Sequence, residues 1–495
     1  MKAKLAGAAT LGVFALAMIE VNAVLTVRNL PSMAELGWNS IGWYFLGLLL
    51  FFLPLSLVAA ELATGWPKGG GVYAWVREAF GEQRGFISIW ADWAENLVWF
   101  PTVLSFMAAT LAYAFSPDLA SNKLYMAVVI LGVFWLVTLL NFYGDKYQGP
   151  ISKVGAIAGV LLPVGVLFLL FFIQVLKGAP SAIEYHGVLP DIKASTIPFV
   201  ATIVLTFAGM EMAGFHALET RNPGRDYPKA ILIAALLIFF FSVGGTIAVA
   251  YTVPSHELSL ASGVIQAVKV MLSQVGASWL TAPLALLLAL GALAQLSTYL
   301  IGPAKAIGVA AAQGDLPPSW RTHNSFGSPV RVLLYQAAIT TVFAMAFILL
   351  PSVNSAYWVL SALTSQGLIV MYLLMFAAVL KLRYTQPDTP RAFVVPGGMA
   401  GIWIVAGVAL VSLVFCFVVG LFPAQAIGIS KLAYIAGMLV SSLFFSVGVP
   451  MLFYKFRKKD WRAPNAQEYI DGVADDGGGG SDRRPPATAT DGGAT

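Results

Sequence analysis

Charge is scarce in this chain of 495 residues, since only 11% of them are Asp, Glu, Lys or Arg while 58% are hydrophobic. An average soluble domain has roughly 25% charged residues. The shortage excludes an ordinary soluble protein and predicts one that lives in a lipid bilayer. The modest net charge of +5 gives no reason to expect a nucleic-acid partner.

Cysteine and histidine are almost missing as well. The single cysteine, Cys416, lies in an apolar run, so no intramolecular disulfide can form. A membrane enzyme needs a nucleophile with its base, or a metal cluster, around one cavity. The four histidines are scattered along the chain instead, at His186, His216, His256 and His323. We therefore expect no enzyme, no metal site and no cofactor.

Apolar sequence is what the chain has in abundance. A helix needs about 20 apolar residues to cross a bilayer, and the sequence contains twelve such runs. The first continues through Arg28 and Pro31 without a cleavage pattern, so we interpret it as a span and not as a signal peptide. The runs are 6–34, 40–63, 86–115, 124–143, 154–176, 196–218, 230–252, 279–312, 331–350, 355–380, 401–423 and 432–455.

Basic residues are concentrated in alternate loops, beginning with the N-terminus. Loops rich in Lys and Arg stay in the cytoplasm, so we predict a multi-pass protein of the cell inner membrane with both termini cytoplasmic. Residues 1–460 form the transmembrane domain. Residues 461–495 are rich in glycine and small polar residues, which predicts a disordered cytoplasmic tail.

The sixth run carries a carboxylate between glycines, in Thr206-Phe-Ala-Gly-Met-Glu211-Met-Ala-Gly214. A charged side chain at the bilayer centre costs about 2.5 kcal/mol or more unless it is paired, protonated or solvated. Glycine lets the backbone open, and open backbone at membrane depth survives only where it lines protein or a cavity. The segment therefore predicts a broken helix beside a binding site.

The first run has a similar segment, Met18-Ile-Glu20-Val-Asn22-Ala-Val24. Transporters built from inverted repeats place their site where corresponding helices break. We predict a repeat of five spans over about 5–176 and another over about 195–382, with two extra helices over about 400–456. Opened helix ends offer N–H groups to a carboxylate and carbonyls to an ammonium, and an amino acid has both. A packing role for Glu20 or Glu211, through hydrogen bonds to another helix, stays open.

Three motifs resemble one known group of proteins. Pro67-Lys-Gly-Gly-Gly-Val-Tyr73 is similar to the signature between the second and third spans of the amino acid–polyamine–organocation (APC) superfamily. Phe207-Ala-Gly-Met-Glu211 with Asn222-Pro-Gly-Arg-Asp-Tyr-Pro228, and Gly302-Pro-Ala-Lys305 with Gln313-Gly-Asp-Leu-Pro317, resemble later signatures of the superfamily. Within it, the chain resembles most the bacterial glutamate/γ-aminobutyrate antiporters.

The resemblance implies an all-α membrane protein of twelve helices, with a five-plus-five inverted repeat, discontinuous helices one and six and two additional helices. It implies a secondary active transporter of amino acids or their amine derivatives that works by alternating access and exchange. The LeuT fold is expected. The substrate-binding residues it implies are Glu20, Val21, Asn22, Ala23, Val24, Asn96, Phe207, Ala208, Gly209 and Met210.

Carboxylates at membrane depth bear on the charge of the substrate. Asp92 and Glu95 are three residues apart on the third run, so they share a helix face. They attract the ammonium of a cationic substrate, or alternatively they pair with Arg28 or with interfacial groups. Glu211 and Glu20 are candidates for proton coupling or gating. Glu61 is interpreted as a structural anchor of the glycine loop that follows it.

Several alternatives stay open. A polyamine or cationic amine importer fits the same residues, and so does a substrate-sensing receptor built on a transporter fold. A channel is disfavoured because no repeated filter loop is visible. The resembling antiporters close with a histidine-bearing C-terminal plug, whereas this tail contains no histidine. The tail could still fold back as a gate. The sequence predicts a small-molecule substrate and a lipid environment and leaves the oligomeric state open.

Overall fold

The computed structural model describes residues 12–66, 71–143, 159, 161–193, 196, 201–209, 211, 223–423, 428 and 430–466. All regular structure in this part of the chain is helical. The helices are α1 (Val13–Val24), α2 (Leu30–Ala34), α3 (Ser40–Gly47), α4 (Leu53–Gly65), α5 (Val72–Phe80), α6 (Glu82–Ala112), α7 (Lys123–Leu140), α9 (Leu162–Leu176), α10 (Ala201–Phe207), α12 (Pro223–Thr252), α13 (Gly263–Gln274), α14 (Thr281–Ala312), α15 (Val330–Ala344), α16 (Ala346–Leu349), α17 (Val353–Thr385), α18 (Gly398–Gly420), α19 (Lys431–Leu439) and α20 (Val449–Phe456). Wide π-helical turns join α3 to α4 and α19 to α20.

Within the described residues, eight helical stretches are long and apolar enough to cross a membrane, and each coincides with one of the runs predicted from the sequence. They are α3 with α4, α7, α12, α14, α15 with α16, α17, α18, and α19 with α20. The other four runs correspond to α1 with α2, α6, α9 and α10. The first, fifth and sixth runs are only partly described, so the predicted number of twelve spans stays a prediction.

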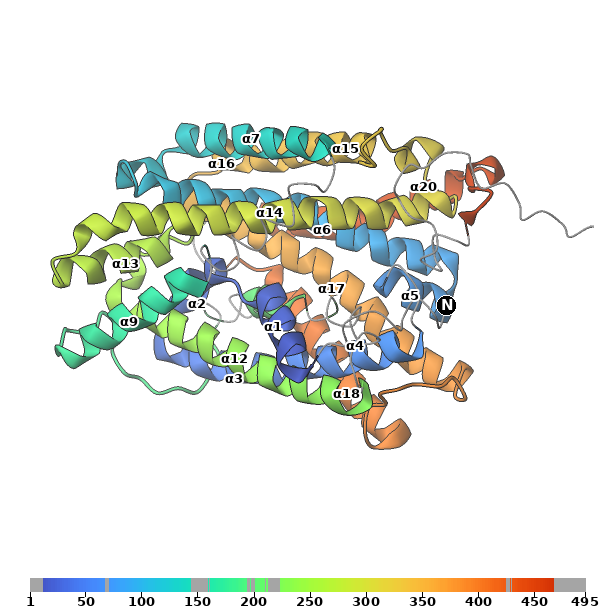
Figure 1. Cartoon of the computed structure of the whole chain (residues 1–495), viewed down its shortest axis with the longest axis horizontal. Coiled ribbons are helices and arrows are strands. Elements are labelled where there is room, and N and C mark those ends of the chain that lie inside the picture. The colour runs from blue at the N-terminus through green and yellow to red at the C-terminus, as the bar shows by residue number, and fades with distance from the viewer. Residues whose placement is uncertain are drawn as a thin grey trace, which may run out of the picture.

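Helices α6, α14 and α17 form the centre of the bundle. Helix α6 packs along both α14 and α17, and Figure 1 shows α6 and α14 running side by side along the long axis of the molecule. The central helices are more buried than the outer ones. In the most apolar part of α17, 83% of the residues are buried, whereas in that of the stretch Lys431–Phe456, which contains α19 and α20, only 22% are. The outer helices leave aliphatic side chains such as Ile404 and Val411 exposed. These outer faces are suited to contact lipid tails.

The third run forms one continuous helix, α6, although it carries Asp92 and Glu95 near its middle. Its 31 residues correspond to about 46 Å at 1.5 Å per residue. Most of its side chains are buried among other helices. The protein interior around α6 thus makes room for polar groups that a lipid-facing helix could not carry.

Candidate functional site

The first run is interrupted after α1. The helix ends at Val24, and the next two residues are extended, with φ −66° and ψ 115° at Leu25 and φ −131° and ψ 126° at Thr26. A short 3-10 turn, Val27–Asn29, leads into α2. The last carbonyls of a helix have no partner within that helix. The end of α1 therefore presents polar backbone atoms in the middle of the predicted span.

The sixth run is interrupted at the predicted glycine. Helix α10 ends at Phe207, and Gly209 has φ 109°, a conformation that side chains disfavour. The Gly209 amide donates a hydrogen bond to the hydroxyl of Tyr372 on α17 over 3.2 Å. That hydroxyl donates in turn to Oε2 of Glu211 over 2.8 Å. Tyr372 thus holds the two sides of the interruption together.

Phe207, predicted to lie beside the opening, is fully buried in the core. Its ring lies 5.0 Å from that of Phe52 and 6.0 Å from that of Tyr44, measured between centroids. Gly47 on α3 leaves room for the same ring, since a Cβ there would come within 3.0 Å of it. The described contacts of Phe207 therefore attach α10 to α3 and to the turn that follows α3.

A polar group lies at the middle of α6. The side-chain amide of Asn96 donates to Oε1 of Glu95 over 2.9 Å and to the backbone carbonyl of Asp92 over 2.8 Å. Glu95 is buried, and its second oxygen has no hydrogen-bond partner among the described residues. The charges of Asp92 and Glu95 act on each other, and Glu211 acts on both. Three carboxylates from α6 and the interrupted sixth run are therefore brought together.

Arg28 is the cation of this region. Its Nη1 donates to the hydroxyl of Thr102 on α6, and its guanidinium carbon lies 5.4 Å from the centre of the Trp99 ring. The Tyr357 hydroxyl donates to the Arg28 carbonyl over 3.0 Å, which fixes the turn that carries the arginine. Arg28 and Glu95 act on each other electrostatically. Sequence reasoning noted Arg28 only as an alternative partner for the carboxylates.

Tyrosines complete the surroundings of the carboxylates. Tyr299 on α14 lies within the electrostatic reach of Asp92, Glu95 and Glu211. Tyr372 lies within that of Glu211 and Glu95. Sequence reasoning missed these residues because no pattern in an apolar run distinguishes a tyrosine that faces a carboxylate from one that packs in the core. An arginine inside a predicted span, in contrast, is a usable signal, and it could have led to Arg28.

Glu20 is a further buried carboxyl group of the region predicted as a site. It is fully buried on α1, and neither of its oxygens has a partner among the described residues. Val21 and Val24 are buried in the core. The side chains of Asn22 and Ala23, and Met210 as a whole, lie outside what the structure describes, while Ala208 lies in the turn after α10.

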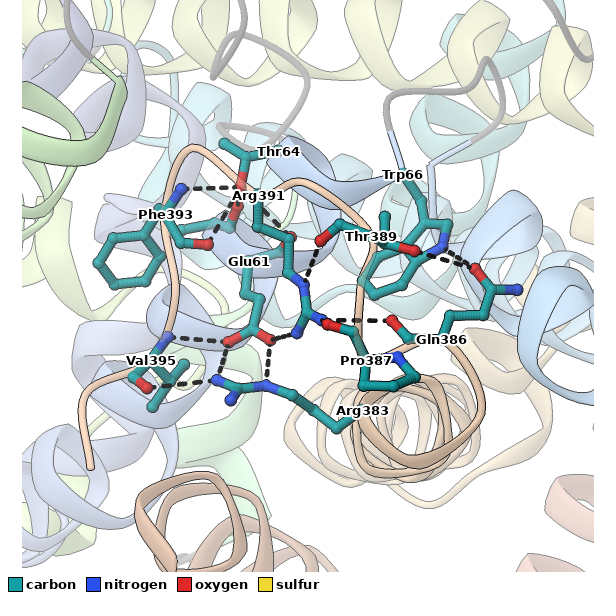
Figure 2. Close-up of polar contacts among 11 residues, drawn as sticks. Glu61, Thr64, Trp66, Arg383, Gln386, Pro387, Thr389, Arg391, Phe393 and Val395 are labelled. Carbon is teal, nitrogen blue, oxygen red and sulfur yellow. Dashed lines mark hydrogen bonds and ion pairs between the residues drawn. The ribbon is translucent and has the colours of Figure 1, made fainter. Parts of the chain in front are cut away.

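Glu61, near the C-terminal end of α4, belongs to a different buried cluster (Figure 2). Its carboxylate accepts from Arg383 Nη2 over 2.7 Å, from Arg391 Nη1 over 3.0 Å and from the Val395 amide over 2.8 Å. The guanidinium of Arg391 also lies over the ring of Trp66. Glu61 therefore anchors the connection between α17 and α18. The sequence interpretation gave Glu61 the role of an anchor for the glycine loop that follows it, whereas its described partners come from this distant connection.

A second ionic cluster closes the same end of the bundle. Glu82 at the start of α6 accepts from Arg77 over 3.1 Å and from Arg457 over 2.9 Å, and Arg457 also reaches Asp315 at 3.4 Å. Burial raises the pKa of Asp315 to about 7, although Arg457 opposes the shift. The segment after α20 continues along this end, where the Ala463 amide donates to the Ala312 carbonyl over 2.8 Å. Residues 467–495 of the predicted tail lie outside the described residues.

Apolar helices around two interrupted ones, with buried charges at the interruptions, define a membrane permease and not an enzyme. The chain belongs to the amino acid permease family, whose profile matches residues 11–444. This confirms the resemblance to the APC superfamily, and the protein is a multi-pass membrane transporter.

The chain is similar to several bacterial transporters, some of them named antiporters. The chain is 41% identical over 447 residues to an uncharacterized transporter of Legionella pneumophila, covering 90% of this chain and 96% of the relative. It is 29% identical over 458 residues to a glutamate/γ-aminobutyrate antiporter of Lactococcus lactis, covering 91% of each. A probable agmatine/putrescine antiporter of the same species is 24% identical over 383 residues, with 77% and 81% covered.

Proposed function

We propose that this transporter exchanges amino acids or their amine derivatives across the cell inner membrane by alternating access. It has twelve spans in a five-plus-five inverted repeat with two additional helices, and both termini are cytoplasmic. The observation that carries the proposal is the interruption of two helices, at Leu25–Thr26 and at Gly209, together with the three carboxylates beside the second. The names of two relatives, both antiporters, support exchange.

In this proposal the opened backbone binds the main-chain groups of the substrate. The ends of α1 and α10 supply the atoms, from Glu20 to Val24 and from Phe207 to Met210. Carbonyls at a helix end suit an ammonium, because they carry partial negative charge. Asp92 and Glu95 add two carboxyl groups on the neighbouring face of α6, and Asn96 orients Glu95.

Glu211 is the proposed proton-coupling or gating group, and Glu20 is the second candidate. The Glu211 carboxylate faces the Tyr372 hydroxyl and lies in the field of Asp92, Glu95 and Tyr299. Loss of its charge on protonation would weaken its hold on Tyr372, which also binds the Gly209 amide. Proton uptake would thus be linked to the conformation of the interrupted helix. Substitution Glu211→Gln should flatten the dependence of uptake on pH, and an unchanged profile would remove Glu211 from this role.

A cationic amine importer is the second candidate function. Three carboxylates against one arginine favour it, since opposite charges attract strongly in a low-dielectric cavity. Exchange and import differ in what they need on the other side of the membrane. An exchanger moves labelled substrate only when a substrate is present in the opposite compartment.

The deciding experiment is counterflow in proteoliposomes that contain the purified full chain. Vesicles are loaded with one candidate and offered labelled glutamate, γ-aminobutyrate, arginine, agmatine, putrescine or a neutral amino acid outside. Exchange predicts uptake that depends on internal substrate, whereas import proceeds into empty vesicles. A substrate-sensing receptor gives binding without uptake. Glu95→Gln should lower the uptake of amines, while Asp118→Asn, at an exposed position in a 3-10 turn, should leave it unchanged. If no amine or amino acid moves, the proposed function is wrong.

A further inference from the structure

Helix α20 has two unlike faces. Its inner face carries Phe453, whose ring lies 5.4 Å from that of Trp90 on α6, measured between centroids. Its outer face carries Leu452 and Phe456, which are four residues apart and 46% and 66% exposed. In the described part of the chain, the stretch Lys431–Phe456 is the least buried of the helical stretches that could cross a membrane. The outer face of α20 is therefore an apolar surface that no other part of the described chain covers.

A dense group of basic residues follows this face. Positions 455–462 contain five basic residues and one acidic residue. The two arginines of the group are paired: Arg457 is 2.9 Å from Glu82 and 3.4 Å from Asp315, and Arg462 is 3.9 Å from Glu82. These ion pairs fix the segment after α20 against the start of α6 and the residues that follow α14. The positive charge of the arginines is thus neutralised within the protein.

The other three basic residues are lysines whose charge is not neutralised. All three are exposed, and among the residues that the structure describes none of them forms an ion pair with an acidic side chain. One of them shares the outer face of α20 with Leu452 and Phe456, and its ammonium lies 5.7 Å from the centre of the Phe456 ring. A lysine can keep its carbon stem on apolar surface while its ammonium reaches polar surroundings. The lysine triplet consists of Lys455, Lys458 and Lys459.

We propose that the outer face of α20 and the lysine triplet form a binding surface for an anionic phospholipid. The acyl chains lie along Leu452 and Phe456, and the phosphate contacts the ammonium groups of the triplet. Clusters of Lys and Arg at the end of a membrane helix attract anionic lipids, and each such residue near the surface strengthens the attraction about fivefold. A free anion would gain nothing from the apolar face. Lipid binding here requires no particular substrate and no particular mode of transport.

The first measurement counts the lipids that the protein retains. The purified full chain in detergent is mixed with equal amounts of phosphatidylglycerol and phosphatidylcholine that have the same acyl chains, and native mass spectrometry identifies what stays bound. We expect wild type to prefer phosphatidylglycerol about tenfold or more. The preference should weaken as the salt concentration rises, because salt screens exposed charges. Equal retention of the two lipids by wild type would overturn the proposal.

The second measurement removes the charge of the triplet. In the variant Lys455→Gln/Lys458→Gln/Lys459→Gln, the preference for phosphatidylglycerol should fall to less than about threefold, because only the acyl chains still bind. Phosphatidylglycerol should raise the melting temperature of wild type more than phosphatidylcholine does, and this difference should disappear in the variant. An unchanged preference in the variant would show that the triplet is not the site.

A matched variant removes the same charge elsewhere. Lys229→Gln/Arg331→Gln/Lys381→Gln changes three exposed positions on other helices, which the distribution of basic residues predicts on the same side of the membrane. It should keep the wild-type preference within about twofold, since the attraction depends on charges near the bound headgroup. An equal loss in both triple variants would mean attraction by overall positive charge, and the local site would be wrong.

The apolar half of the surface has its own test. Leu452→Ser/Phe456→Ser should lower the retention of both lipids and leave their ratio unchanged, since the lysines remain. Glycerophosphate carries the charge of the headgroup without acyl chains. If it displaces phosphatidylglycerol at equal concentration, the lysines bind a free anion and the lipid proposal fails. If the spectra instead show a dimer whose protomers retain no phosphatidylglycerol, a second copy of the chain covers this face and the proposal fails as well.

Every side chain changed in these variants is exposed, so each variant should fold, and its melting temperature in detergent checks this. Should one of them fail to fold, the wild-type comparison of the two lipids, its salt dependence and the glycerophosphate competition still decide the question. Counterflow remains the separate test of transport, so failure of lipid binding and failure of the proposed function are distinguishable.

Discussion

The Glu61 cluster allows a direct test of how much a buried ion pair contributes to the stability of the closed end of the bundle. In Glu61→Gln, the carboxylate that joins Arg383, Arg391 and the Val395 amide becomes neutral (Figure 2). The side-chain relative exposures of Glu61, Arg383 and Arg391 are 0%, 8% and 5%. Two guanidinium groups therefore lose their shared counter-ion where water barely reaches them.

The expected loss follows from burial. Removing one partner of a buried pair usually costs about 3 to 5 kcal/mol, because the remaining charge is left uncompensated. Part of this is recovered, since the glutamine oxygen can still accept from Val395. An exposed pair provides the comparison: Lys193 and Asp191 are 2.7 Å apart, but their side chains are 71% and 32% exposed. Asp191→Asn should cost about 1 kcal/mol or less.

The assay is unfolding of the purified full chain in detergent, followed by fluorescence and by protease sensitivity of the connection between α17 and α18. We expect Glu61→Gln to unfold far more easily than Asp191→Asn, with early cleavage near residues 386–395. The affinity of the folded fraction for substrate should not change, because Glu61 does not contact the central carboxylates. A Glu61→Gln protein as stable as Asp191→Asn would refute the reasoning.

Three further variants test other contacts. Tyr372→Phe removes the hydroxyl that binds Gly209 and Glu211 but keeps the ring against Phe51. Exchange should slow about tenfold or more, while the free energy of unfolding should fall by only about 1 kcal/mol. Equal exchange rates in variant and wild type would contradict this. Asp315→Asn should flatten the pH dependence of the stability. The pKa of Asp315 is about 7 in the folded protein against 3.8 for the free group, so the folded state binds the proton more tightly than the unfolded state. The wild type therefore loses stability as the pH rises from about 4 to 7. Melting temperatures at pH 5 and pH 8 check this, and a wild-type-minus-variant difference that is the same at both would disprove it. In Gly367→Ala the new Cβ would come within 2.7 Å of the Glu95 Cβ, so substrate affinity should fall; Gly407→Ala, with no atom within 4 Å, should leave affinity and stability unchanged.

Patterns local in the sequence predicted local features well. Eight apolar runs became helices long enough to span a membrane, because hydropathy and length are properties of one segment. The interruption at Gly209 follows the glycine in the sequence, since backbone freedom is also a local property. Asp92 and Glu95 share a helix face because spacing alone determines it.

Partners distant in the sequence could not be predicted in this way. Glu61 was expected to anchor the adjacent glycine loop, yet its described contacts are with Arg383 and Arg391, more than 300 residues further along the chain. The hydroxyl of Tyr372 reaches Glu211 only because α17 crosses the interrupted helix. Such contacts depend on how helices pack, and an apolar sequence offers many packings of similar hydrophobicity.

The attachment of the last described residues to the end of α14 has a practical consequence for anyone who modifies this protein. The hydrogen bond from Ala463 to Ala312 and the burial of Ala466 show that the packed structure continues beyond α20 to at least residue 466. A truncation or fluorescent-protein fusion made directly after Phe456 would remove this contact, together with Arg457. Tags for purification or imaging are better joined after residue 466, where they leave these interactions in place.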